Sequence, residues 1–112
     1  MRTSILQEDW ITQDKENQMQ PLHTKIEKSI QTTMGLVVLE SPINFPRKEC
    51  NLYCCLENGK ILWQAEKPEP NGLYSRLKMN NDGETLSVYA VTGQACEIDL
   101  RTGKLISQIL IK

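Results

Sequence analysis

Apolar and polar residues alternate with a period of two from His23 onward, as in half-buried β-strands. The apolar runs are short, and clusters containing Pro, Gly, Asn or Asp separate them. This pattern predicts an all-β fold, an antiparallel meander of about seven or eight strands between residues 24 and 112. The proline-rich loops 41–49 and 66–72 interrupt the meander, because proline lacks the backbone N–H that a strand interior needs.

Four dipeptides mark the expected hairpin turns. Each ends in glycine, which adopts positive φ at no steric cost. They are Asn58-Gly59, Asp82-Gly83, Thr92-Gly93 and Thr102-Gly103. The second half of the chain is therefore predicted to be four strands joined by three tight turns.

Residues 1–22 differ from the rest of the chain. They mix carboxylates and amides with isolated apolar residues, and they end beside Pro21. Ser4 is a candidate N-cap for a short helix whose apolar positions include Trp10 and Ile11. The segment is predicted to be a polar N-terminal arm or a short helix, with a ragged first strand as the alternative.

One hairpin sequence occurs twice. "NLYCCLENGKILWQAE" at 51–66 and "ACEIDLRTGKLISQIL" at 95–110 superpose with a shift of 44 residues, which also places Leu52 and Cys54 on Cys96 and Ile98. A period in the forties with four strands per unit is typical of propeller blades. We therefore expect a single β domain, 23–112, made of two blade-like four-stranded units at about 23–66 and 73–112.

The stretch "DGETLSVYAVTGQACEIDLRTGKLI" resembles quinoprotein-type β-propeller blades and, more loosely, WD repeats. Together with "NLYCCLENGKILWQ", it also resembles a group of small uncharacterised bacterial proteins. The resemblance covers roughly residues 34–112 and implies blade architecture. It implies no activity, because the matching residues are turn and core positions, and the quinone-binding residues and Trp-Asp dipeptide have no counterparts.

Charge and hydropathy narrow the class of partner. The chain has 13 Lys and Arg against 14 Asp and Glu, so nucleic acid and anionic membrane surfaces are not expected partners. The longest apolar stretch, "GLVVL", is far too short to span a bilayer, and no signal peptide is apparent. We expect a cytoplasmic protein with reduced thiols.

Candidate chemistry is sparse, and no catalytic residue, metal site or cofactor is predicted. Cys50 and Cys54 have half of a zinc-ligand spacing, but Cys54 and Cys96 fit better as buried apolar residues, with Cys50 the most accessible thiol. His23 has no neighbouring nucleophile motif. Glu97 and Asp99 share one strand face, which is more often a solvated face than a cation site.

Four aromatic residues from different strands are the predicted partner-binding set: Tyr53, Trp63, Tyr74 and Tyr89. Tyrosine and tryptophan are enriched at protein interfaces, although core packing is their commoner role. The sequence therefore favours a non-enzymatic protein-interaction module that binds another protein or itself, as a homodimer. An antitoxin or immunity-type inhibitor is one concrete version. The alternative is a small-molecule-binding or enzymatic β domain with a pocket between the two units.

Overall fold

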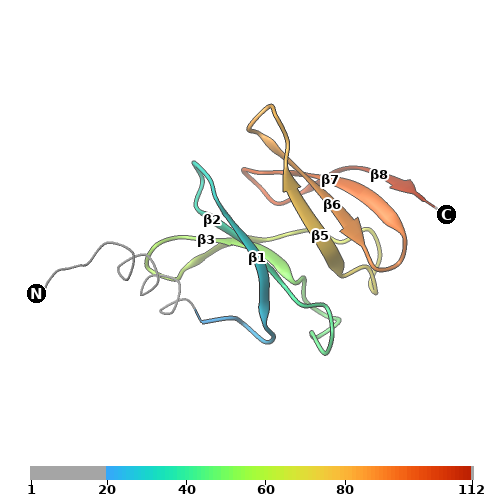
Figure 1. Ribbon diagram of the computed structural model, residues 1–112, viewed down its shortest axis with the longest axis horizontal. Coiled ribbons are helices and arrows are strands. Elements are labelled where there is room, and N and C mark those ends of the chain that lie inside the picture. The colour runs from blue at the N-terminus through green and yellow to red at the C-terminus, as the bar shows by residue number, and fades with distance from the viewer. Residues whose placement is uncertain (1–19, 112) are drawn as a thin grey trace, which may run out of the picture.

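The computed structural model describes residues 20–111, and these form an all-β fold with no helix (Figure 1). Eight antiparallel strands make two four-stranded sheets, ordered β1-β2-β3-β4 (sheet A) and β5-β6-β7-β8 (sheet B). The strands are β1 (Ile26–Gln31), β2 (Leu36–Glu40), β3 (Leu52–Cys55), β4 (Ile61–Gln64), β5 (Tyr74–Met79), β6 (Thr85–Ala90), β7 (Gln94–Asp99) and β8 (Leu105–Leu110). The predicted fold class is confirmed. The predicted N-terminal arm or helix lies outside the described residues, apart from its last three positions.

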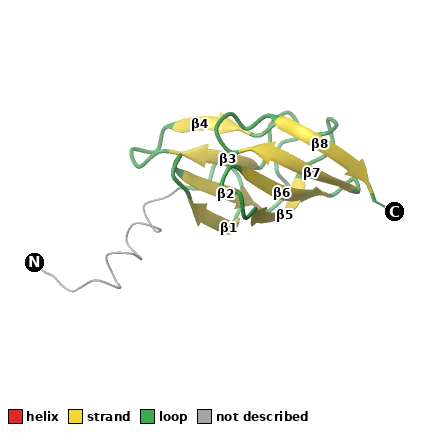
Figure 2. Cartoon of the chain, turned by 90° about the horizontal axis from the view of Figure 1, so that it is seen from above, coloured by secondary structure: helices red, strands yellow, loops and turns green. Residues whose placement is uncertain are grey.

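The two sheets are stacked on one another and share one core. Figure 2 shows β1 and β5 along one edge of the molecule and β4 and β8 along the other. The core lies between the sheets, where residues such as Leu52 and Trp63 of sheet A pack against Leu86 and Ile98 of sheet B. A second, smaller cluster of buried residues lies on the outer face of sheet A and comprises Val38, Tyr53 and Cys55. Sheet A is therefore apolar on both faces.

The predicted turn glycines all have positive φ. The angles are 86° at Gly59, 68° at Gly83, 102° at Gly93 and 75° at Gly103. Each of the four glycines lies between two consecutive antiparallel strands. The turn positions predicted from the sequence are confirmed, because the conformation that these turns need is one that glycine adopts without strain.

The repeated hairpin forms in both sheets, but its first strand is shifted by one residue relative to the 44-residue spacing predicted from the sequence. Tyr53 pairs with Gln64 in sheet A, and Cys96 pairs with Gln108 in sheet B. Gln64 and Gln108 keep the spacing of 44 residues. Tyr53, and not Leu52, is the structural counterpart of Cys96. The predicted superposition of Leu52 on Cys96 is therefore wrong by one position.

A longer turn in sheet B causes the displacement. The β3–β4 turn is closed by a hydrogen bond from the Leu56 N–H to the Lys60 carbonyl, four residues on. The β7–β8 turn is closed from the Asp99 N–H to the Lys104 carbonyl, five residues on. The extra residue reverses which side chains of the preceding strand point to each face, because strand side chains alternate.

This displacement decides how the sheets stack. Tyr53 lies on the outer face of sheet A, whereas its counterpart Cys96 points toward sheet A from sheet B. Equivalent positions therefore point in the same direction in both sheets, and the sheets stack front to back. The resemblance to propeller blades stays a prediction, because two sheets do not close a ring.

Asn51 connects the two sheets. Its side chain is fully buried and lies just before β3. The amide nitrogen donates to the Glu40 carbonyl at 2.7 Å and to the Tyr74 carbonyl at 2.6 Å, and the amide oxygen accepts from the Tyr74 N–H at 2.9 Å. Asn51 thus bonds both main-chain polar groups of the first residue of β5, as a strand neighbour would.

Glu40 holds the chain that leads into β1. Its side chain is fully buried and accepts hydrogen bonds from the N–H groups of Leu22, His23 and Thr24 and from the Tyr53 hydroxyl. Burial by itself would raise the pKa of the Glu40 carboxyl. The hydrogen bonds from Tyr53 and from the three backbone donors outweigh burial, and the pKa lies below its ordinary value.

Glu40→Gln should lower the free energy of unfolding by about 2 kcal/mol at pH 7, because hydrogen bonds to a charged group are lost. A depressed carboxyl pKa contributes stability above the unfolded-state pKa, about 4.3, and this stability is lost as the pH falls through the lower folded-state value. Urea unfolding from pH 7 to 3 should show the difference between wild type and Glu40→Gln shrinking below about pH 4. The exposed Glu97→Gln is the control. A difference that does not change with pH would contradict the role of the Glu40 charge.

Candidate protein-interaction surface

Three of the four aromatic residues predicted to bind a partner are buried. Trp63 and Tyr74 lie between the sheets, and Tyr53 lies in the cluster on the outer face of sheet A. Their polar atoms are bonded inside the protein: the Trp63 indole N–H donates to the Leu100 carbonyl at 2.9 Å, and the Tyr74 hydroxyl donates to the Glu66 carbonyl at 2.8 Å. These three side chains pack the fold. Tyr89 is half-buried and is the one member of the set that is not buried.

All four cysteines are buried thiols. This confirms the predicted burial of Cys54 and Cys96. Cys50, which was predicted to be the most accessible thiol, is 4% exposed against 0–3% for the other three, and it belongs to the core between the sheets. Burial raises the pKa of Cys50 to about 11 and that of Cys54 to about 11. Thiols in this state are poor nucleophiles near neutral pH.

The remaining candidates for chemistry are dispersed. His23 Nε2 lies 3.1 Å from a carboxylate oxygen of Glu49, and its ring meets Phe45 edge-on at 5.0 Å between centroids. Glu97 is exposed on β7, and Asp99 is half-buried beside the following turn, where it accepts from the Arg101 N–H. Within residues 20–111, no cluster of three or more His, Cys, Asp or Glu side chains is placed to hold a metal ion.

An open groove of about 600 Å³ lies where loops from the two sheets meet. It is bounded by the loop after β2, the loop before β5 and the turn after β6. Its lining is Pro42, Ile43, Asn44, Phe45, Arg47, Asn71, Leu73, Val91 and Thr92. The sequence-based alternative of a pocket between the two units corresponds to this groove.

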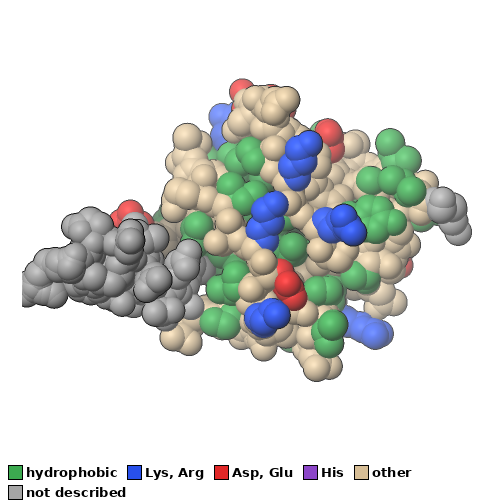
Figure 3. Space-filling view, viewed as in Figure 1, with side chains coloured by type: hydrophobic (Ala, Val, Ile, Leu, Met, Phe, Trp, Pro, Cys, Tyr) green, Lys and Arg blue, Asp and Glu red, His purple; other side chains and the backbone are tan. Residues whose placement is uncertain are grey.

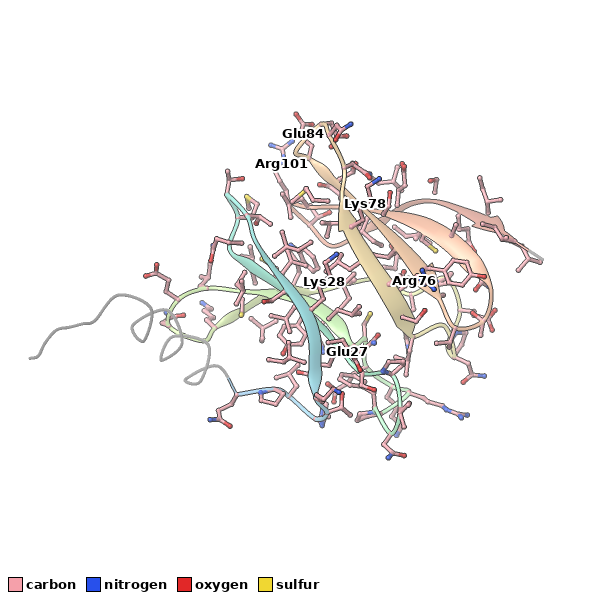
Figure 4. The ribbon with its side chains drawn as sticks, viewed as in Figure 1. Glu27, Lys28, Arg76, Lys78, Glu84 and Arg101 are labelled. Atoms are coloured by element: carbon pink, nitrogen blue, oxygen red, sulfur yellow. The ribbon has the colours of Figure 1, made fainter. Side chains whose placement is uncertain are left out.

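Charged side chains protect the edge formed by β1 and β5. Lys28, Arg76 and Lys78 lie along these two strands, with Glu27 beside them (Figure 4). The Lys28 ammonium donates to the Leu77 carbonyl at 2.8 Å and thereby occupies a main-chain acceptor of β5. Charged residues, lysine above all, are a common protection of exposed strands against pairing with other chains.

The opposite edge is different, because β8 exposes a row of aliphatic side chains. Ile106, Ile109, Leu110 and Ile111 are 54%, 67%, 56% and 48% exposed, and we call these four residues the C-terminal edge. Figure 3 shows apolar side chains gathered beside the C-terminal residue. Four large aliphatic residues in a run of six positions are an apolar patch, not scattered exposure of the kind found on any soluble protein.

The start of β8 is anchored, which holds the C-terminal edge in place. Leu105 packs against the core, and its N–H donates to a carboxylate oxygen of Glu66 at 2.8 Å. The neighbouring strand β4 is the other member of this side of the molecule but is only four residues long. The longer β8 is therefore the strand on this side that offers an extended apolar surface.

The C-terminal edge belongs to the sequence "LISQILI". Alternation of apolar and polar residues predicts that one face of such a strand is buried in a core, so it does not predict that these residues are exposed. The alternation does not indicate that sheet A leaves the end of β8 uncovered. The useful signal is that residues 109–111 are all apolar, which departs from alternation at the end of the chain.

The fold and this surface define a small all-β domain of two stacked antiparallel sheets with one charged edge and one apolar edge. The model of a protein family, "Domain of unknown function (DUF7957)", matches residues 9–110, and the chain belongs to this family. No curated protein and no solved structure matches the chain. A membrane-spanning helix is not present between residues 20 and 111.

Proposed function

We propose that this protein is a non-enzymatic protein-interaction module that binds its partner through the C-terminal edge. The supporting observation is the contrast between the two sides of the sheets. The β1–β5 side carries charges and a capped carbonyl, whereas Ile106, Ile109 and Leu110 of β8 and the following Ile111 are exposed. Exposed apolar residues on an open strand are a common means of association, because a partner strand adds main-chain hydrogen bonds to apolar contacts.

The chemistry of the described residues fits this proposal. Burial raises the pKa of Cys50, Cys54, Cys55 and Cys96, so these thiols are poor nucleophiles near neutral pH. Cysteine thiols also fit a reducing compartment, so the proposal places the protein in the cytoplasm. An antitoxin or immunity-type inhibitor is the version of this function that requires only a binding surface.

Ile109→Lys should weaken partner binding at least 30-fold, the equivalent of about 2 kcal/mol, because a charge replaces a central apolar contact. The partner is captured from native lysate on the full chain, identified by mass spectrometry, purified and titrated by calorimetry. Ile43→Lys is the matched control, since Ile43 is 73% exposed but lies in the loop after β2. Equal binding by Ile109→Lys and wild type would refute the proposed surface.

The groove between the loops supports a second candidate, the binding of a small molecule. Apolar residues such as Phe45 and Leu73 line it together with Arg47 and Asn71, a combination suited to an apolar ligand with a carboxylate or phosphate group. A metabolite that raises the melting temperature of wild type but not of Arg47→Ala would favour this function. Ile43→Lys then impairs binding, and Ile109→Lys leaves it unchanged.

A further inference from the structure

Alternate residues of β8 direct their main-chain N–H and C=O groups away from β7, and the pairing of β8 with β7 decides which residues these are. The Ile111 N–H donates to the Gly93 carbonyl at 2.8 Å, and Ile109 and Ser107 pair with Ala95 and Glu97. Antiparallel strands alternate hydrogen-bonded and non-hydrogen-bonded pairs. Ile111, Ile109 and Ser107 therefore direct their N–H and C=O groups toward β7, whereas Gln108 and Leu110 direct theirs outward.

We propose that the partner of this edge is a second copy of the chain, paired antiparallel through β8 about a two-fold axis at Gln108. This inference rests on the proposed function and names its partner. In a two-fold pair of antiparallel strands the axis is perpendicular to the sheet, so one residue faces its own copy. The outward N–H and C=O of Gln108 then bond those of Gln108 in the other copy.

The side chains of β8 match in this register. Ile106 lies opposite Leu110 of the other copy, so two exposed aliphatic residues of each copy meet. The pairing of β8 with β7 is irregular at Ile106, and Leu105 beyond it packs against the core. The neighbouring two-fold register, centred on Ser107, places Leu110 opposite Lys104 and Ile106 opposite Gln108. The register at Gln108 thus pairs the exposed Ile106 and Leu110 with each other, whereas the register at Ser107 pairs both of them with polar residues.

Pairing of this kind joins two copies of sheet B into one sheet of eight strands and closes the open edge of both copies. A closed, isologous contact uses up the edge, so assembly ends at the dimer. The contact involves one strand from each copy and is small beside stable interfaces, which bury about 1,200–2,000 Å². The dimer is therefore expected to dissociate on dilution.

Cysteine cross-linking tests the register. Gln108→Cys should form a disulfide-linked dimer under mild oxidation, because facing residues in an antiparallel pair have Cα atoms about 5.5 Å apart, within disulfide range. Ser107→Cys is the matched control, since in this register it lies diagonal to its copy at about 7–8 Å. Wild type, whose cysteines are buried, should give no linked dimer. Linkage through Ser107→Cys in place of Gln108→Cys overturns the register.

Sedimentation velocity over a concentration series tests the dimer itself. The full-length wild type should shift from monomer to twice that mass, with no larger species. Gln108→Pro should remain monomeric, because it removes an outward N–H without breaking a bond to β7. Its circular dichroism spectrum should match that of wild type. Open-ended assembly of wild type overturns the proposal, since it indicates pairing of β8 with another edge.

A wild type that stays monomeric at all concentrations also overturns this inference. It does not refute the proposed function, which fails only if a purified partner binds Ile109→Lys as well as it binds wild type. The two proposals therefore fail on different measurements.

Discussion

Gly103→Ala is expected to destabilise the protein by about 3–4 kcal/mol. Gly103 has a φ of 75°, a conformation that costs other residues roughly 1–2 kcal/mol. An added Cβ would also lie 2.6 Å from Cε3 and 2.7 Å from Cδ2 of Trp63. The indole is held by its hydrogen bond to the Leu100 carbonyl, so it cannot move away without losing that bond. Overpacking of this kind costs about 1–3 kcal/mol more.

Gly59→Ala is the matched control for this prediction. Gly59 is the counterpart of Gly103 in the repeated hairpin and has a φ of 86°, but an added Cβ there meets nothing within 4 Å. It should cost only the backbone strain, about 1–2 kcal/mol. Urea unfolding followed by circular dichroism gives both values. Equal losses for the two variants would show that contact with Trp63 does not contribute.

Asn51→Ala is expected to cost about 3–5 kcal/mol, because it leaves three buried main-chain groups without a partner. These are the carbonyls of Glu40 and Tyr74 and the N–H of Tyr74. Each buried polar group left unpaired costs about 1–3 kcal/mol, and the three are close enough together that their costs do not simply add. Without these hydrogen bonds the attachment of sheet B to sheet A should also weaken.

Asn51→Asp and Asn58→Ala separate the contributions. Asn51→Asp keeps an acceptor for the Tyr74 N–H but removes both donors and buries a charge, so it should be no more stable than Asn51→Ala. Asn58 is exposed and accepts one hydrogen bond from the Lys60 N–H at 2.9 Å, so Asn58→Ala should cost under about 1 kcal/mol. Urea unfolding of the three variants measures these differences. A loss at Asn51→Ala as small as that at Asn58→Ala would contradict the connecting role of Asn51.

The strands and turns of this protein could be predicted from local sequence. Period-two alternation and the glycines at 59, 83, 93 and 103 act through the conformations of neighbouring residues, and the structure has eight antiparallel strands with turns at these glycines. The repeat was also apparent, since Gln64 and Gln108 occupy equivalent positions 44 residues apart. Burial of Cys54 and Cys96 followed from their apolar neighbours.

Whatever depends on which surfaces meet was decided by the tertiary structure. One extra residue in the 99–104 turn reversed the faces of β7 relative to β3, and no local pattern reports such a reversal. Trp63 and Tyr74 are buried because the opposing sheet covers them, whereas Tyr53 is buried in the cluster on the outer face of sheet A. Asparagine is a residue type common in loops, and Asn51 becomes a buried connection between the sheets only because Tyr74 approaches it. Ile109 and Leu110 are exposed because no distant part of the described chain covers them. A side chain is buried by residues distant in the sequence, and the alternation of a strand predicts two faces without saying which of them will be covered.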